Sequence, residues 1–259
     1  EAGTAITTGD ANVAVGFSAL KTEDAHGFNT AIGYESLKTL NAGADAYNTA
    51  VGFRSGLSVT TGAQNTFIGG LAGDATTTAS NNSALGWSAL TTNTTGAQNV
   101  AVGTTSLFSN TTGSTNTALG DAALKENTTA SNNTAVGKDA LRANTTGASN
   151  IAMGSGALEA NTTASYSTAV GFEALKANTT GSALVAVGAS ALDANTTGTS
   201  NIGVGNNALG ANTTGAGNTS VGIDALAANT TAANNTAVGV NSLKANTTGA
   251  LNTAMGSGA

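Results

Sequence analysis

Residues 133–149 read Asn-Thr-Ala-Val-Gly-Lys-Asp-Ala-Leu-Arg-Ala-Asn-Thr-Thr-Gly-Ala-Ser, and closely similar 17-residue units fill almost the whole chain. The first glycine of this unit, Gly137, recurs every 17 residues from Gly52 to Gly256. Self-similarity at a fixed period is the signature of a solenoid, in which each unit contacts mainly its neighbours. The sequence therefore predicts an all-β fold, a parallel β-solenoid (β-roll) of about 15 coils.

The spacing is longer than 17 residues at one place only. Gly16 and Gly33 are 17 residues apart, whereas Gly33 and Gly52 are 19 apart, which predicts a two-residue loop insertion near Leu40–Asp45. Both ends of the chain fall inside a repeat. We therefore expect residues 1–259 to form a single repetitive shaft, a rod that is one segment of a longer protein.

Composition narrows the possible classes of protein. Charged residues make up 8% of the chain, against roughly 25% in ordinary soluble domains. Hydrophobic residues make up 40% and keep strict register, which favours order over disorder. A net charge of −6 argues against nucleic-acid binding, which needs clustered Lys and Arg. No apolar run approaches the roughly 18 residues of a membrane span, and the chain has no Cys for disulfides or thiolate metal sites.

A short strand is predicted just before each repeat glycine, which we number position 0. Position −1 is always apolar, and position −3 is β-branched in every unit except that of Ser83. Position −2 is Ala in most units and is replaced by Phe67, Gly203 and Ser220 in the others. Alternation of this kind predicts a strand whose two larger side chains point inward. The Ala column should then point outward, against another backbone.

The segment after the glycine is harder to assign. Positions +1 and +2 vary without pattern, as in a solvent-facing turn, and position +3 is always Ala or Ser. Position +4 is Leu except at Gly56 and Gly73, where we expect under-packed coils. Ala and Leu favour helix, but one turn is not stable alone. A second strand is the favoured interpretation, with a single helical turn as the alternative.

Two asparagine positions recur, one in Asn-Thr-Thr-Gly or Asn-Thr-Thr-Ala at position +7 and one at position −4. Asparagine suits turns because its amide binds nearby backbone groups. Stacked at one position per coil, these amides could also bind each other along the axis. Ser167 and Leu184 depart from the position −4 column and should mark the weakest coils.

The predicted coil is narrow. Seventeen residues give a contour of roughly 56 Å, enough for two or three short strands and their turns. A single thin solenoid has a small core. Several chains packed along a common axis would bury the Ala columns and so enlarge the buried surface. We therefore expect a homotrimer with the Ala columns at the subunit contacts, which a double replacement of Ala118 and Ala135 by Leu would overpack.

The strand motifs resemble a known family. Asn12–Gly16, Asn29–Gly33 and Asn150–Gly154 are similar to the head repeats of trimeric autotransporter adhesins of the YadA type. That resemblance implies a trimeric, left-handed parallel β-roll. The Asn-Thr-Ala-Val-Gly and Asn-Thr-Thr-Gly pattern is also similar to repeat arrays of bacteriophage tail fibres. Neither the coiled-coil stalk nor the membrane anchor of the adhesins occurs in this sequence.

Motifs for chemistry are sparse, and we expect no enzyme activity, cofactor or metal. His26, the single histidine, has no Cys or His partner for a metal and is interpreted as a surface-loop residue. Residues 203–208 match the dinucleotide fingerprint G-x-G-x-x-A, but no long helix can follow before the next Asn-Thr-Thr-Gly. The Asn-Thr-Thr sequons are explained by the regular turns. Acidic residues such as Asp139, Glu173 and Asp224 are expected to provide solubility.

The expected function is the structural shaft of a phage tail fibre or cell-surface appendage that presents a binding tip. Its partners would be two further copies of the chain, with a cell-surface glycan or receptor bound through flanking domains. The expected location is extracellular. Two alternatives are an adhesin head that itself binds surfaces and, less favoured, an ice-binding solenoid. If recognition lies within this chain, the exposed aromatic residues Tyr34, Tyr47, Phe53 and Trp87 are the candidates.

Overall fold

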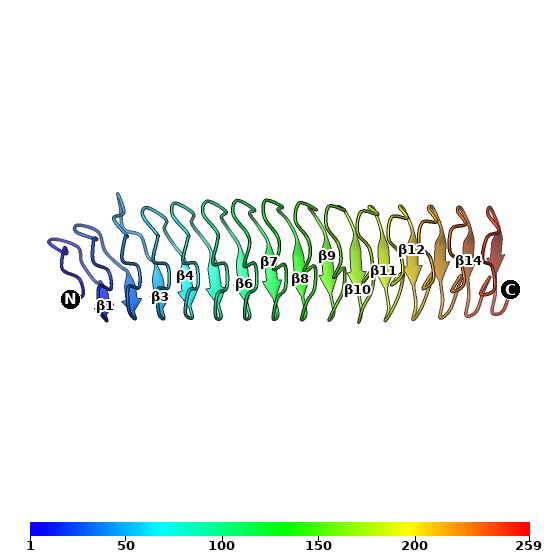
Figure 1. Ribbon diagram of the computed structural model, residues 1–259, viewed down its shortest axis with the longest axis horizontal. Helices are drawn as coiled ribbons and strands as arrows, with labels where there is room; N and C mark the ends of the chain where they lie inside the picture. Colours follow the sequence, from blue (N-terminus) through cyan, green and yellow to red (C-terminus); the bar gives the residue numbers. More distant parts are fainter. The chain divides into compact units, whose positions relative to one another are not determined.

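The computed structural model describes residues 1–259, which fold into two compact units, residues 1–132 and 133–259. Every regular element is a three-residue strand, and no helix capable of crossing a membrane is present. Within each unit successive strands lie side by side (Figure 1), and we number each coil by its strand. The first unit contains β1 (Val13–Val15), β2 (Thr30–Ile32), β3 (Thr49–Val51), β4 (Thr66–Ile68), β5 (Ser83–Leu85), β6 (Val100–Val102) and β7 (Thr117–Leu119). The second contains β8 (Thr134–Val136), β9 (Ile151–Met153), β10 (Thr168–Val170), β11 (Val185–Val187), β12 (Ile202–Val204), β13 (Thr219–Val221), β14 (Thr236–Val238) and β15 (Thr253–Met255).

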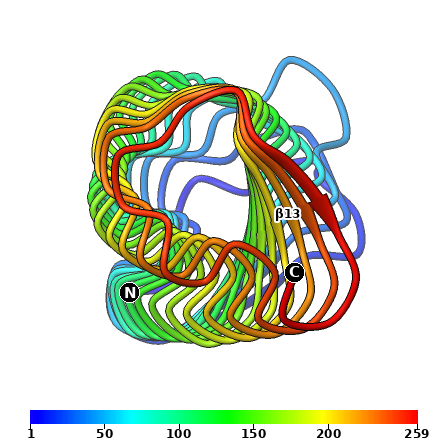
Figure 2. The same cartoon turned by 90° about the vertical axis from the view of Figure 1, so that its right-hand side faces the viewer.

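Neighbouring strands within each unit pair in parallel, one repeat apart. Thr168 of β10, for example, lies beside Val185 of β11. The predicted parallel β-solenoid and its 17-residue repeat are confirmed. Thr30 of β2 pairs with Thr49 of β3, so the insertion does not disturb the register. The extra residues form the light-blue loop that projects from its coil in Figure 2.

The strands face the opposite way from the prediction. The central Ala of almost every strand, such as Ala101 and Ala152, is fully buried inside its own coil. The larger side chains at positions −3 and −1 point outward. The buried leucine at position +4 packs beside the central residue and leaves room for only a methyl group, which explains the small residue. The Ala columns are therefore not at subunit contacts, and replacing Ala118 and Ala135 with Leu would overpack the coil interior instead.

The segment after the repeat glycine forms a turn, so the expected second strand is wrong. Its residues at positions +2 and +4 have positive φ, as in Asp139 at +57° and Leu141 at +51°. A non-glycine residue in this region is strained by roughly 1–2 kcal/mol. Packing and hydrogen bonds to the next coil hold the conformation: Leu141 is fully buried, and its N–H donates to the carbonyl of Ala157 at 3.0 Å.

Coils 3 and 4 are not under-packed at Gly56 and Gly73. Phe67 takes the place of the usual inward Ala in β4 and is fully buried. A Cβ added to Gly56 would lie 3.0 Å from the Phe67 ring, and one added to Gly73 would lie 2.7 Å from it. The phenyl ring therefore fills the volume that two leucine side chains occupy elsewhere.

Both asparagine columns form hydrogen-bonded ladders inside the coils, which confirms their predicted stacking. Asn99 donates from its backbone N–H and from Nδ2 to Oδ1 of Asn82, at 3.0 and 3.2 Å. The same Nδ2 donates to the carbonyl of Gly113 at 2.9 Å. In the second ladder, Nδ2 of Asn110 donates to Oδ1 of Asn93 at 2.9 Å. Each ladder satisfies buried backbone groups that the short strands leave unpaired.

The position −4 ladder changes where the sequence departs from asparagine. The N–H of Leu184 donates to Oγ of Ser167 at 3.4 Å. Leu184 offers no side-chain acceptor to the next coil, and Nδ2 of Asn201 instead lies 3.4 Å from Oδ1 of Asn195 in the other ladder. Faster hydrogen exchange over residues 160–190 than in neighbouring coils stays the prediction for this region.

Replacing Asn99 with alanine is expected to destabilise the first unit by about 1–3 kcal/mol, because it removes the acceptor of a buried backbone N–H. That N–H belongs to Asn116 and lies 3.0 Å from Oδ1 of Asn99. Chemical denaturation followed by circular dichroism measures the loss. Asn99→Ser is the matched control, since Ser167 accepts a bond at the same position. Equal stability of the Ala and Ser variants would contradict the ladder's energetic role.

Candidate functional site

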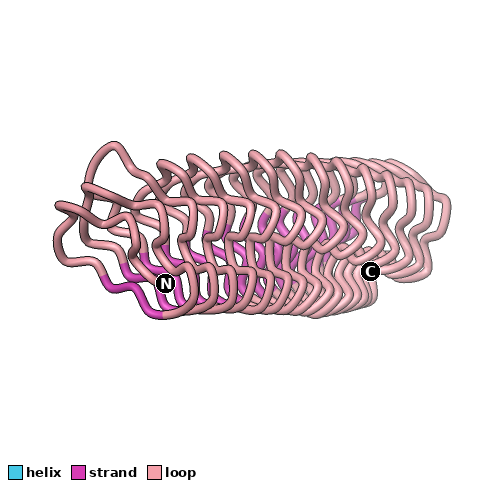
Figure 3. Tube along the Cα trace, turned by 60° about the vertical axis from the view of Figure 1, so that its left-hand side comes forward, coloured by secondary structure: helices cyan, strands magenta, loops and turns pink.

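An uncharged strand face runs along each unit. We define it as the side chains at the first and last positions of every strand. In each unit the strands follow one side of the coil stack (Figure 3). Their outward side chains are substantially exposed: 56% for Val15, 47% for Leu119 and 44% for Met153. The last residue of every strand is apolar, whereas the first is Thr or Ser in ten of the fifteen strands. The exposed apolar row is the kind of surface that marks interaction sites on soluble proteins.

Charged side chains lie elsewhere on the coil. No strand contains a charged residue, and after residue 46 every charged residue falls within six positions after a repeat glycine. Ion pairs run along this charged edge, including Arg142 Nη2 to Glu159 Oε1 at 3.1 Å and Lys244 Nζ to Asp224 Oδ2 at 2.9 Å. Hydrogen bonds from Asn207 and Lys244 lower the pKa of the Asp224 carboxyl. The coil therefore separates a solvated, charged edge from the uncharged strand face.

Two stacks of aromatic rings flank the strands of the first coils. The rings of Phe17, Tyr34 and Phe53 stack in one column after β1, β2 and β3, with centroids 5.4 and 5.5 Å apart. On the other side, Phe28 and Tyr47 precede β2 and β3 and stack with centroids 5.0 Å apart. All five side chains are between 45% and 60% exposed.

The structure places the four predicted recognition residues at three locations. Tyr34 and Phe53 share one stack, whereas Tyr47 lies in the other stack across the strand. Trp87, two coils beyond Phe53, leans over Gly70: a Cβ added to that glycine would meet the indole ring. The set is therefore not one cluster. Its members lie on both sides of the strand face, and Trp87 is in neither stack.

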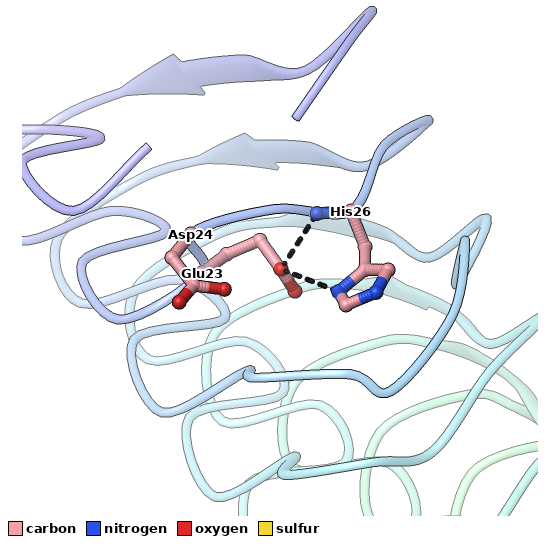
Figure 4. A group of neighbouring side chains, drawn as sticks. All are labelled: Glu23, Asp24 and His26. Carbon is pink, nitrogen blue, oxygen red and sulfur yellow. Dashed lines mark hydrogen bonds and ion pairs between the residues drawn. The ribbon is translucent and has the colours of Figure 1, made fainter. Parts of the chain in front are cut away.

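Glu23, Asp24 and His26 form the one group of acidic and histidine side chains that are close enough to share a metal ion. Their potential ligand atoms lie within 4.8 Å of one another (Figure 4). Glu23 is fully buried at position +7, where the coils from β5 to β14 carry asparagine. Its Oε1 accepts from the backbone N–H of His26, and its Oε2 from that of Ala42, both at 3.2 Å. Both carboxylate oxygens thus anchor loop backbone, as the ladder amides do. This explains the buried carboxylate without a metal ion.

The remaining motifs are parts of the repeat. Gly203 is the central residue of β12, and Gly205 is the repeat glycine, so residues 203–208 form a strand and a turn. A dinucleotide fingerprint needs a helix N-terminus at this point to receive the pyrophosphate. The sequon asparagines Asn93 and Asn110 are fully buried and hydrogen-bonded, so the folded coil does not present them for glycosylation.

The sequence did not lead us to predict the strand face. It also did not lead us to include Phe17 and Phe28 among the exposed aromatic residues. A signal for the face exists in the sequence. Position −2 is almost always small, whereas position −1 accepts Val, Ile, Leu and Met. Variable size marks the side with open space, and a strict size limit marks the interior. The stacks could have been found from aromatic residues that recur one repeat apart.

Comparison with family models, curated proteins and solved structures gave no match. The resemblance to adhesin heads and tail-fibre arrays therefore stays a prediction from the repeat motifs. The strand face and the aromatic stacks carry the functional proposal.

Proposed function

We propose that this chain is the shaft segment of a homotrimeric fibre, on a phage tail or a bacterial cell surface, that presents a binding tip carried by flanking domains. The observation that carries the proposal is the uncharged strand face, with its exposed apolar row, repeated on every coil. A shaft needs such a face for assembly and needs no catalytic group. The location of the fibre would be extracellular.

The composition of the strand face supports association with identical copies. Outward residues such as Val100, Val102 and Leu85 would be shielded from water, which stabilises an assembly by roughly 25 cal/mol per Å² of apolar surface covered. The same face repeats at a fixed step along each unit. A partner with the same step can match it coil by coil, and a second copy has that step by construction.

Symmetry favours copies arranged around an axis parallel to the coil stack. Only such an axis gives every coil of a unit an equivalent contact, because rotation about it leaves heights along the stack unchanged. Closed rotational symmetry is also the usual arrangement of homo-oligomers. Three copies would enclose the strand faces in a common interior and leave the charged edges in solvent. The number three is supported by the resemblance to the adhesin heads.

Oligomeric state tests the proposal directly. Sedimentation equilibrium of the purified chain should give three times the chain mass of 24.7 kDa. The double variant Leu85→Asp, Val102→Asp places charges on the strand face and should yield folded monomers, since burying unpaired charges in an interface is strongly unfavourable. The control Thr104→Asp lies at position +1, where Asp121 occurs naturally, and should stay trimeric. A monomeric wild-type chain, or a trimeric double variant, would contradict this assignment.

A binding assay separates the shaft from the alternative adhesin head. Repetition gives many near-identical surfaces, whereas specific recognition is concentrated on irregular loops. The purified trimer should therefore bind bacterial cells and glycan arrays weakly or not at all. Tight, saturable binding by residues 1–259 would favour the adhesin head instead.

A further inference from the structure

A repetitive interface leaves the axial register of the copies undefined. If copies associate through their strand faces, as proposed above, a slip by one coil would match nearly the same Thr, Val and Ile side chains again. In β structures, register is specified only where something distinguishes one alignment from the next. A uniform fibre therefore needs a non-repetitive feature beside the strand face.

The aromatic stacks of coils 1–3 are such a feature. Phe28 and Tyr47 lie two residues before their strands, and Tyr34 and Phe53 lie two residues after them. The stacks thus border the strand face on both sides. In the following coil the corresponding positions hold Gln64 and Gly70. The stacks therefore end at coil 3, and aromatic residues return at these two positions only in coils 5 and 10, as Trp87, Tyr166 and Phe172.

The geometry of the stacks favours a protein surface over a sugar as their partner. The ring planes lie 10–15° from parallel, so neighbouring rings cover each other's faces. Sugars pack their C–H groups on open ring faces, and the ring faces inside each stack are covered by the neighbouring ring. Stacked rings are also held rigid, and rigid aromatic side chains provide contact area at little entropic cost.

The exposed aromatic area is large enough to affect assembly. Each aromatic side chain presents about 150–250 Å² when free, so five half-exposed rings offer about 500 Å². A standard interface buries about 800 Å² per partner. A slip by one coil would move this area away from its matching coils.

We propose that Phe17, Phe28, Tyr34, Tyr47 and Phe53 set the axial register between copies of this chain, by packing against coils 1–3 of the neighbouring copy. The inference rests on the proposed assembly through the strand face. It assigns the predicted recognition residues Tyr34, Tyr47 and Phe53 to self-recognition, together with Phe17 and Phe28.

Disulfide cross-linking between copies tests the register, because the native chain has no Cys. Leu85→Cys and Val102→Cys chains are refolded together and oxidised. The two sites are equivalent positions one coil apart. With native aromatics, same-site products should dominate. With all five aromatics changed to Ser, the mixed 85–102 product should rise about fivefold or more, because disulfides form only between Cα atoms within about 7 Å.

The matched control changes five exposed threonines at position +9 to serine, away from the strand face: Thr61, Thr78, Thr95, Thr112 and Thr129. This control should keep the native cross-link pattern. If the aromatic variant does not fold by circular dichroism, the pair Phe28→Ser, Tyr47→Ser is tested in its place, with a smaller rise expected.

The outcomes distinguish the two proposals. Trimers of the aromatic variant with an unchanged fraction of mixed product would overturn the register inference and leave the shaft proposal intact. A monomeric parent chain in sedimentation would overturn both. A glycan that binds the native chain but not the aromatic variant, with register unchanged, would reassign the stacks to surface recognition.

Discussion

Replacing Gly171 with alanine is expected to destabilise coils 10 and 11 by about 2–6 kcal/mol, through backbone strain and overpacking together. Gly171 has φ of +140°, a conformation that side-chain-bearing residues rarely adopt. Its Cβ would also collide with the carbonyl group of Gly188 in the next coil. Backbone touches backbone at this point, so no flexible side chain can move aside. Hydrogen exchange of coils 10 and 11 measures the local loss.

Gly181→Ala is the matched control for this prediction. Gly181 lies ten residues after Gly171, and its φ is outside the positive region. Its Cβ would also approach a backbone carbonyl, that of Gly198, so the two glycines differ in φ and not in the presence of a backbone contact. Other coils carry alanine at the same position, as in Ala130, Ala164 and Ala232, where each methyl is almost fully buried. The control should therefore change stability by less than about 1 kcal/mol, within the range of tolerated substitutions. Equal effects of the two substitutions would refute the positive φ as the reason for the repeat glycine.

Replacing Phe67 with alanine, the usual residue at its position, is expected to destabilise the first unit by about 3–5 kcal/mol. The ring fills space next to Gly56 and Gly73, and alanine would leave a cavity there. The repeat pattern alone would predict the opposite, no loss of stability, because alanine is the common residue at this position. Denaturant unfolding of the variant decides between the two views.

A second substitution provides the rescue. Gly73→Leu alone should also be destabilising, because its Cβ would lie 2.7 Å from the Phe67 ring. Combined with Phe67→Ala, the leucine regains the usual packing, and its φ of +60° matches that of the leucines in other coils. The double variant should recover most of the lost stability, a coupling typical of residues in contact. Additive losses in the double variant would contradict the proposed compensation.

Local sequence patterns were sufficient for much of the fold. The recurrence of Gly137 and its equivalents predicted the period, and the β-branched pattern before each glycine predicted the strands. The asparagine columns predicted ladders, because stacked amides at one position per coil have each other as nearest partners. The turn after the glycine was not predictable: Leu141 adopts a positive φ that its propensity disfavours, and tertiary packing overrides that preference.

The sequence by itself determined the period, the strand positions, the parallel register and the stacking of the amides, because these follow from repetition along the chain. Only the tertiary structure decided which side of each strand faces inward. The alternation of small and large residues puts Ala101 on one side of its strand and Val100 and Val102 on the other. The pattern is the same whichever side faces the coil interior. The buried leucine at position +4, which packs beside the central residue in the folded coil, selects the methyl for the interior. Because the methyl group faces inward, the side chains of the strand face point outward, beside the stacks that contain Tyr34 and Tyr47. A second copy of the chain can reach them there.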